Sequence, residues 1–395
     1  MTESKSQDKN IKIIREQPSQ LSLFKKIDSP ILSNAVRLVD FFMGAIFDDS
    51  KRINRDRENG LYLQPKEEEL EIEGKKLKIS VTPARVKDSK TGKYLDYLPG
   101  LKEQKILKTL IKIASEESSD ASFYGNSVSP YLVVTTTYHA IQKVIGLSSG
   151  KNKYNKGQIA KAIKILQNTN VTILDEQGIE ISAPLLSSVV TLGKDLDDIK
   201  NNKALCIGLS PIFSKSIALG SFRLYNYQKD MESPDLLTSY LYSKLVHKFT
   251  YASNNREYSF MASSLLLEFP TLKKWKRFDK VLTKIEEAIK NLSSTVSKYE
   301  IDNRYLENGT SRKKLIDAKI TIWGTDEFIK EQIISNAKKE KSVIDTQTLL
   351  EIKRPEQPEN GSEKEFESYI KEAEEYNKNK DSIKATNIIN NIFKE

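Results

Sequence analysis

The chain has 395 residues, with 63 Lys and Arg against 54 Asp and Glu, which gives a net charge of +9. One cysteine, Cys206, excludes a disulfide framework and a Cys-based zinc site, and two isolated histidines argue against a His-rich metal centre. No apolar stretch is long enough to cross a bilayer, and the N-terminus lacks the apolar core of a signal peptide. We therefore expect a cytoplasmic protein with no membrane, metal or cofactor partner. The excess of basic residues favours a polyanionic partner.

Residues 1–65 are expected to form a flexible N-terminal segment with one amphipathic helix. The segment begins as a polar tail, and the apolar side chains of Ile31–Phe47 then recur at steps of three and four, which is the spacing of a helix face. Residues 51–58 form a charged run that is typical of a solvated linker. From Glu69 to Thr82, apolar and polar residues alternate around Gly74, which predicts a β-hairpin.

Residues 66–230 are expected to form a first compact unit, in which three helices and a short strand lead to a hairpin. The third helix has the signature of a capping box, because Asn155 is followed three residues later by Gln158. The expected elements are a helix after Gly100, a strand at 131–135, helices at 135–147 and from Asn155 onward, and hairpin strands at 171–174 and 179–181.

Residues 231–330 repeat this order of elements, although no sequence identity links the two halves. Ser233 and Pro234 mark a helix start, as an N-cap followed by proline. The apolar side chains of Leu272–Leu292 recur at three and four and predict one continuous helix. The other expected elements are a strand at 257–260, a short helix at 263–269 that stops at Pro270, and hairpin strands at 299–301 and 318–323.

The matched order predicts an α+β fold with two tandem winged-helix (helix-turn-helix) DNA-binding domains, 66–230 and 231–330. The hairpin of each unit is then its wing. Residues 331–395 are mostly charged, contain two prolines and carry more acidic than basic side chains. We expect them to form a charged, partly disordered tail, so that the net positive charge belongs to the folded part.

Basic residues concentrate on the third helix of each unit. Lysine and arginine there would neutralise phosphates, while Asn155, Gln158 and Arg277 could read base edges in a major groove. A helix dipole favours acidic residues near the N-terminus and basic residues near the C-terminus. In Leu272–Leu292 the order is reversed, because the cations come first and Glu286-Glu287 come last. This suggests that the N-terminal end of the helix faces an anion. A merely solvated basic face is the alternative, and it weighs more for the first helix. The candidate DNA-binding residues are Lys151, Lys153, Asn155, Lys156, Gln158, Lys161 and Lys164, and Lys273, Lys274, Lys276, Arg277, Lys280 and Lys284.

A basic tip on the second hairpin extends this pattern. Arg304, Arg312, Lys313 and Lys314 bracket the turn Asn308-Gly309. A basic hairpin tip suits contact with the DNA backbone or the minor groove, although solvation alone also explains a charged loop.

A short peptide in the N-terminal tail reads Gln20-Leu21-Ser22-Leu23-Phe24. It resembles the pentapeptide with which bacterial proteins engage the sliding clamp of the replisome. Its Leu-Phe pair would fill an apolar pocket of the clamp, so the segment has to be accessible. The alternative is a chance apolar cluster that packs on the surface of the protein itself.

Together, the tandem winged helices and this peptide resemble the replication initiators of bacterial plasmids, in particular the TrfA-like and RepA-like group. Residues 209–213 (LSPIF) and Tyr240–Leu245 also resemble stretches of that group. The resemblance implies binding to repeated origin sequences (iterons) in double-stranded DNA, local duplex opening, and recruitment of the sliding clamp and of the host helicase and initiator. It also implies that monomers and dimers differ in activity, so a homodimer is a possible state.

The sequence assigns no catalytic residue, and we expect that the protein is not an enzyme. Neither His139 nor His247 has the histidine partner that a rolling-circle nuclease needs, while a tyrosine nucleophile with a carboxylate-bound metal stays open. Residues 146–152 are one residue too short for a phosphate loop. His139 and Cys206 lie beside apolar residues and are expected in the core. The main alternative function is a sequence-specific transcriptional regulator of a mobile element, which would not need the clamp peptide.

Overall fold

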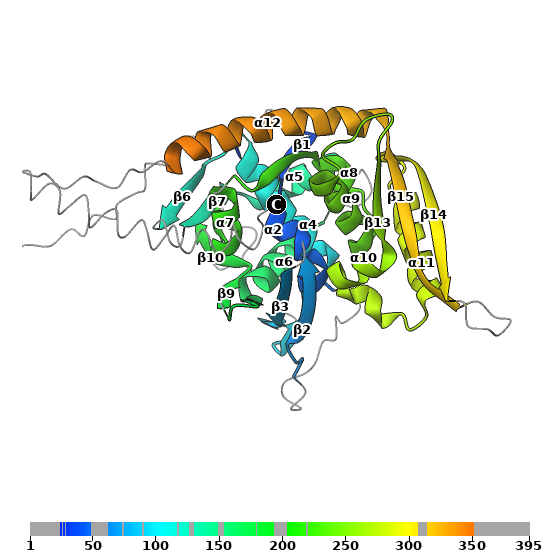
Figure 1. Ribbon diagram of the computed structural model, residues 1–395. Helices are drawn as coiled ribbons and strands as arrows, with labels where there is room; N and C mark the ends of the chain where they lie inside the picture. The colour runs from blue at the N-terminus through cyan, green and yellow to red at the C-terminus, as the bar shows by residue number, and fades with distance from the viewer. Residues whose placement is uncertain are drawn as a thin grey trace, which may run out of the picture.

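The computed structural model describes the chain from residue 24 to residue 350, with gaps. The described residues are 24–25, 27, 29–48, 62–72, 75–88, 91–116, 118–125, 130–148, 154–178, 180–192, 204–218, 220–306 and 314–350. In this part of the chain, helices and small antiparallel sheets form a mixed α+β fold (Figure 1).

The described residues of the first half include two four-stranded sheets, ordered β2-β3-β8-β9 and β10-β11-β7-β6. Both hairpins predicted for this half lie in the first sheet, as β2-β3 and β8-β9, so these two predictions are confirmed. The strands are β2 (Lys66–Ile72), β3 (Lys75–Thr82), β4 (Ala84–Lys87), β5 (Tyr94–Tyr97), β6 (Ala121–Gly125), β7 (Pro130–Thr136), β8 (Asn170–Asp175), β9 (Glu180–Pro184), β10 (Leu186–Leu192) and β11 (Ala204–Leu209). The helices are α4 (Leu101–Ser115), α5 (Tyr138–Ser148), α6 (Lys156–Asn168) and α7 (Pro211–Ala218).

The apolar segment Ile31–Phe47 is not one amphipathic helix, so that prediction is wrong. It begins as strand β1 (Leu32–Val36), which pairs with β12 (Phe222–Asn226), and continues as the short helices α2 (Arg37–Phe41) and α3 (Met43–Ile46). From residue 33 to residue 47, every side chain except that of Arg37 is buried. The helical spacing was misleading because the segment is covered on all sides and has no solvated face.

The second half contains the three-stranded sheet β13-β15-β14 and the helices packed on it. The predicted strand, the short helix before Pro270 and the predicted hairpin are all present, so these predictions are confirmed. The elements are α8 (Tyr227–Met231), α9 (Leu236–Lys248), β13 (Glu257–Met261), α10 (Ala262–Glu268), the 3₁₀ helix η2 (Pro270–Lys274), α11 (Phe278–Lys290), β14 (Val296–Leu306) and β15 (Lys314–Gly324).

Helix α9 is capped by Asp235 rather than by the predicted Ser233. The Asp235 carboxylate accepts hydrogen bonds from the backbone NH of Thr238 at 2.8 Å and from its hydroxyl at 3.0 Å. Aspartate and serine are comparable caps, so local preference alone does not choose between them. Ser233 is buried, and its carbonyl accepts a hydrogen bond from the Lys105 ammonium at 3.0 Å, which fixes it before the helix.

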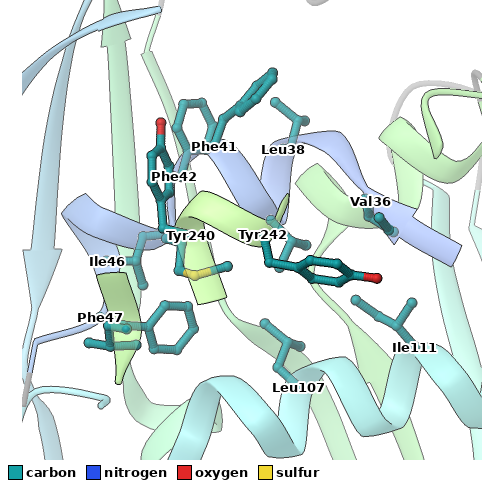
Figure 2. Packing of buried hydrophobic residues seen from close by; sticks show 14 of the residues in the cluster. Val36, Leu38, Phe41, Phe42, Ile46, Phe47, Leu107, Ile111, Tyr240 and Tyr242 are labelled. Atoms are coloured by element: carbon teal, nitrogen blue, oxygen red, sulfur yellow. The ribbon is translucent and has the colours of Figure 1, made fainter. Parts of the chain in front are cut away.

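The two halves share one hydrophobic core. Figure 2 shows Tyr242 of α9 close to Leu107 and Ile111 of α4, and Tyr240 of α9 close to Phe42 and Ile46. This buried cluster extends along the chain from Phe24 to Ile329. Residues 66–230 and 231–330 are therefore joined through their interiors.

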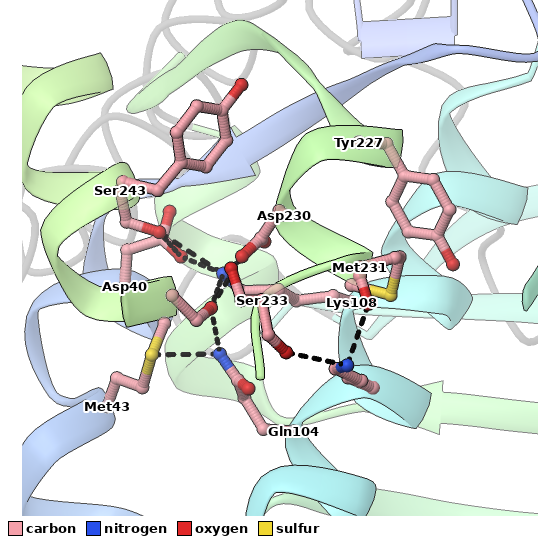
Figure 3. A network of polar contacts seen from close by, with 12 residues as sticks. Asp40, Met43, Gln104, Lys108, Tyr227, Asp230, Met231, Ser233 and Ser243 are labelled. Atoms are coloured by element: carbon pink, nitrogen blue, oxygen red, sulfur yellow. Dashed lines mark hydrogen bonds and ion pairs between the residues drawn. The ribbon is translucent and has the colours of Figure 1, made fainter. Parts of the chain in front are cut away.

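A buried polar cluster crosses the same interface (Figure 3). The Lys108 ammonium of α4 lies 2.5 Å from Asp230 Oδ2 of α8 and 3.2 Å from Asp40 Oδ1 of α2. It also donates to the hydroxyls of Ser239 and Ser243 on α9. Burial alone would lower the pKa of Lys108, but Asp230 and Asp40 raise it above its ordinary value, so the ammonium stays charged.

Helix α12 (Asp326–Leu350) continues past residue 330, where the sequence predicts the start of a charged tail. In Figure 1 it runs along the top of the molecule, from β15 toward the end that holds β6. Arg223 of β12 donates to Gln332 at 3.2 Å and to Asn336 at 2.6 Å. These contacts and the burial of Ser335 hold the helix on the first half. Residues 351–395 lie outside the described residues.

Candidate nucleic-acid interface

Helix α6 begins where the sequence predicts, at a capping box. Asn155 Oδ1 accepts the NH of Gln158 at 2.8 Å, and Gln158 Oε1 accepts the NH of Asn155 at 2.9 Å. Each side chain thereby satisfies a backbone donor at the start of the helix. Both polar residues predicted to read bases on this helix therefore have a structural role in the free protein.

The outer face of α6 carries lysines while its apolar stripe is buried. Lys156 and Lys161 are exposed and Lys164 is half-buried, all on the side away from the core. The Lys161 ammonium donates to the Tyr97 hydroxyl at 3.0 Å and lies 4.4 Å from the centre of that ring. The two other lysines predicted for this unit, Lys151 and Lys153, lie outside the described residues.

The predicted continuous helix Leu272–Leu292 is wrong, because the chain is broken within it. Pro270 begins the 3₁₀ helix η2, the residues after Lys274 leave the helix, and α11 starts at Phe278 with an extended Arg277 as its N-cap. Leu272 is buried, whereas Trp275 is 37% exposed. The apolar spacing that looks continuous in the sequence therefore belongs to two separate elements.

The break also takes Lys273, Lys274 and Lys276 out of the helix on which the helix-dipole argument was based. Lys273 and Lys274 lie at the end of a short helix, where free carbonyls favour cations. Asp279 lies in the first turn of α11, where free NH groups favour an anion. Lys273, Lys274 and Asp279 thus follow the dipole rule, whereas Lys280 in the first turn of α11 and Glu287 in its last turn do not. What remains is a run of exposed residues, here called the cationic segment: Lys273, Lys274, Trp275, Lys276 and Arg277.

Surface ion pairs hold some of these cations. The Arg277 guanidinium donates to both carboxylate oxygens of Asp279, at 3.0 and 2.5 Å. On α11, Lys284 pairs with Glu287 at 2.5 Å, and Lys280 is exposed on the same helix. Pairs that are open to water are weak and sensitive to salt, so phosphate oxygens can compete with these carboxylates.

Trp275 is the residue of this interface that sequence reasoning missed, because its spacing placed it in the apolar stripe of the predicted helix. The ammonium groups of Lys274 and Lys284 lie 6.0 and 5.8 Å from its ring. The ring borders a cleft of about 260 Å³ between η2, α9 and α11. The signal that could have identified it is its position directly between lysines, where a core side chain is unusual.

Strands β14 and β15 form the predicted hairpin beside α11, each eleven residues long. Arg304 is exposed on β14, opposite Asp317 of β15. Asp317 is already engaged, since it accepts the NH of Ser263 at 3.0 Å and its hydroxyl at 2.6 Å. Lys314 is the first residue of β15, while Arg312 and Lys313 lie outside the described residues.

The end of the clamp-like peptide is part of the fold. Phe24 is fully buried and packs edge-on against Phe222, with the ring centres 5.2 Å apart. Its carbonyl accepts a hydrogen bond from Asn34 Nδ2 at 2.6 Å. Residues 20–23 lie outside the described residues. In this conformation the Phe24 ring is not free to enter a pocket on another protein.

The histidines and the cysteine form no metal site in the described part of the chain. His139 is exposed rather than in the core, because it lies on the outer side of α5, and Cys206 is half-buried. His247 is buried and bonded to Asp40. Among the described residues, no group of His, Cys, Asp or Glu could hold a metal ion.

None of the described helices combines the length and the apolar character that a membrane crossing requires.

Comparison with known proteins gives a structural similarity. No protein-family model matches the chain, and no curated protein sequence matches it. The fold is similar to the crystal structure of domains 2 and 3 of RctB, determined on selenomethionine derivatives. The TM-score is 0.43 and the sequence identity 13%, over 73% of this chain and 99% of the RctB chain.

Proposed function

We propose that the protein is a DNA replication initiator, which binds repeated origin sequences in double-stranded DNA through two winged-helix units. The observation that carries the proposal is the cationic segment, where five successive residues including four cations are exposed directly before α11. The order α10, α11, hairpin β14-β15 is that of a helix-turn-helix with a wing. The order α5, α6, hairpin β8-β9 is the same in the first half.

In this proposal α11 enters the major groove from its N-terminal end. Lys273, Lys274 and Lys276 contact phosphates, and Arg277 exchanges Asp279 for the DNA. Arg304 on β14 contacts the backbone beside the groove. On the first unit, Lys156, Lys161 and Lys164 of α6 contact a neighbouring part of the same site. No enzymatic step is required of the chain.

The experiment for DNA binding compares a triple variant, Lys273→Gln, Lys274→Gln and Lys276→Gln, with the wild-type protein on a labelled duplex. The duplex carries the direct repeats expected beside the coding region, and a scrambled duplex is the control. Removing three phosphate contacts should lower affinity at least ten-fold and reduce the log–log salt slope by about 0.9 per contact. Equal affinity and slope for both proteins would refute this interface.

Recruitment of the sliding clamp by Gln20–Phe24 is a further part of the proposal. Because Phe24 is buried against Phe222, clamp binding requires Phe24 to detach first. Replacing Leu23 and Phe24 by Ala would disturb the fold as well, so the sharper change is Leu23→Ala alone. It should abolish binding to an immobilised clamp while the DNA affinity stays that of the wild type, and thermal melting of the variant checks that the fold is retained.

The burial of Phe24 favours a second candidate, a sequence-specific regulator of a mobile element, which does not need the peptide. A replication assay separates the two functions. The gene and its flanking repeats are joined to a selectable marker without another origin and introduced into a bacterial host. Autonomous replication that is lost in the triple lysine variant supports an initiator. DNA binding without replication supports the regulator.

A further inference from the structure

A small hairpin that the sequence analysis does not anticipate lies beside α6. Strands β4 and β5 pair only with each other among the described strands, and they join neither four-stranded sheet. A two-stranded ribbon is marginally stable by itself. Here it is held by packing, because Ala84, Val86 and Tyr97 form a small buried cluster with Ile165 of α6.

The hairpin presents cations on its outer side. Burial alternates along β4, so that Ala84 and Val86 face α6 while Arg85 and Lys87 are exposed. The Arg85 guanidinium lies 4.4 Å from the centre of the Tyr94 ring, which is itself 43% exposed. Stacking on this ring restrains the long side chain before any ligand arrives, which reduces the entropy lost on binding.

The described carboxylates of the hairpin, Asp88 and Asp96, accept hydrogen bonds within the protein. Asp88 accepts the NH of Thr91 at 2.9 Å and its hydroxyl at 3.2 Å, within the turn. Asp96 is fully buried and accepts the NH of Leu63 at 3.1 Å. Asp96 lies opposite Arg85 on the same face of the hairpin, but its side chain is buried there. The exposed charges of β4 are therefore those of Arg85 and Lys87.

This positive surface borders the outer face of α6. The Lys161 ammonium is bonded to the hydroxyl of Tyr97, the last residue of β5. A duplex that lies along the lysines of α6 would therefore meet the β4-β5 hairpin next to the helix. Phosphates are the groups that a sugar–phosphate backbone offers to such a surface, and guanidinium and ammonium groups bind them well.

We propose that Arg85 and Lys87 bind backbone phosphates of duplex DNA docked on α6, so that the β4-β5 hairpin extends the interface of the first unit beyond its helix-turn-helix. The inference rests on the proposed function, because it needs DNA on α6. The contacts add affinity and fix the position of the duplex, but they read no bases.

The test uses the full chain and mixed-sequence duplex DNA, since phosphate contacts do not depend on sequence. Lys87→Gln is compared with Lys330→Gln, a matched change at an exposed lysine on α12, and Arg85→Gln/Lys87→Gln is measured as well. Fluorescence anisotropy titrations at several salt concentrations give affinity and salt slope, and circular dichroism confirms folding. Tyr94→Leu tests the stacking without changing charge.

Lys87→Gln should lower the magnitude of the log–log slope by about 0.9 and the double variant by about 1.8, while Lys330→Gln leaves it unchanged. Tyr94→Leu should weaken binding several-fold with a nearly unchanged slope. If the wild type binds with a clear salt slope and the hairpin variants match Lys330→Gln, the hairpin assignment is wrong and the proposed function stands. If the wild type shows no salt-dependent binding, the proposed function fails, and this inference fails with it.

Discussion

Lys108 places a charged ammonium at the centre of the molecule, with its side chain only 4% exposed. A charge in such a place is tolerated only when it is paired and hydrogen-bonded, and Asp40 and Asp230 supply the pairing from two different helices. Packing apolar side chains there would stabilise the interior equally well. What the ion cluster adds is directionality, because it is satisfied in one arrangement of α2, α4, α8 and α9.

Replacing Lys108 by Met should strongly destabilise the protein, because it leaves two carboxylates buried without their cation. Breaking a buried pair in this way typically costs about 3–5 kcal/mol. Chemical denaturation of the variant and the wild type measures the loss. A triple variant that also carries Asp40→Asn and Asp230→Asn should recover a large part of it. A Lys108→Met protein as stable as the wild type would contradict the role assigned to the cluster.

His247 predicts how stability depends on pH. Its Nε2 lies 2.9 Å from Asp40 Oδ2, and burial lowers the pKa of His247 below the ordinary 6.5, although Asp40 acts in the opposite direction. The native protein therefore keeps the ring neutral where the unfolded chain already takes up a proton. Stability should fall as the pH drops below about 6.5, by at most about 1.4 kcal/mol per pH unit from this group.

The measurement is the free energy of unfolding of the wild type and of His247→Gln between about pH 7 and about pH 5. Glutamine can still donate to Asp40 but does not titrate, so its profile should be flatter in this range. Burial alone would raise the pKa of Asp40, but Lys108 and the hydrogen bond with His247 hold it below its ordinary 3.8. The contribution of Asp40 to stability is therefore lost only at lower pH. Parallel profiles for both proteins would show that His247 does not titrate as argued.

At the scale of elements, the accuracy of the sequence predictions follows from how local each signal is. The capping box of α6 was predictable because Asn155 and Gln158 satisfy each other within one turn. The hairpin β2-β3 was predictable because its alternation reflects one covered and one open face. The breaks in Ile31–Phe47 and Leu272–Leu292 could not be predicted, because each depends on contacts with distant parts of the chain. The first segment begins as a strand because it pairs with β12. In the second, η2 packs against α3 and β2.

The candidate site shows the same division. The presence of a cationic run in the second unit could be read from the sequence. Its conformation could not, because α11 starts only at Phe278 and the cationic segment precedes this helix. The hairpin β4-β5 was missed because Arg85 and Lys87 alternate with only two apolar residues, which is too short a pattern to stand out. Phe24 was misplaced because a tail that docks on a distant strand leaves no local trace.

Trp275 gives the cationic segment an optical reporter. The chain has two tryptophans, Trp275 and Trp323, so Trp323→Phe leaves Trp275 as the single emitter. Adding duplex DNA should change the intensity or position of its emission, because its lysine neighbours then lie on phosphates and its exposed ring changes surroundings. In the reciprocal variant Trp275→Phe, Trp323 on β15 should respond less. An unchanged Trp275 emission at saturating DNA would place the contact elsewhere.

At the scale of the whole molecule, the two halves behave as one folded body. Helix α9 belongs by sequence to the second half, yet its aromatic side chains share the core with α4 of the first. Helix α12 starts after the last strand of the second half and is bonded to β12 of the first. The relative position of α6 and α11 is thereby fixed from the inside by the core and from the outside by α12.

A fragment of residues 233–330 should therefore fail to fold independently. Without α4 and the segment 33–47 it would expose Tyr240 and its buried neighbours, and each large apolar side chain left in water forfeits about 1.5–3 kcal/mol of burial. A few such losses equal the 5–15 kcal/mol that stabilises a typical domain. Circular dichroism should show reduced helix content and no cooperative melting for this fragment, whereas residues 24–350 should melt cooperatively like the full chain. A fragment 233–330 that melts in one sharp transition and binds DNA with the salt slope of the full chain would show that the shared core is dispensable, and that the second unit reaches its DNA contacts without help from the first.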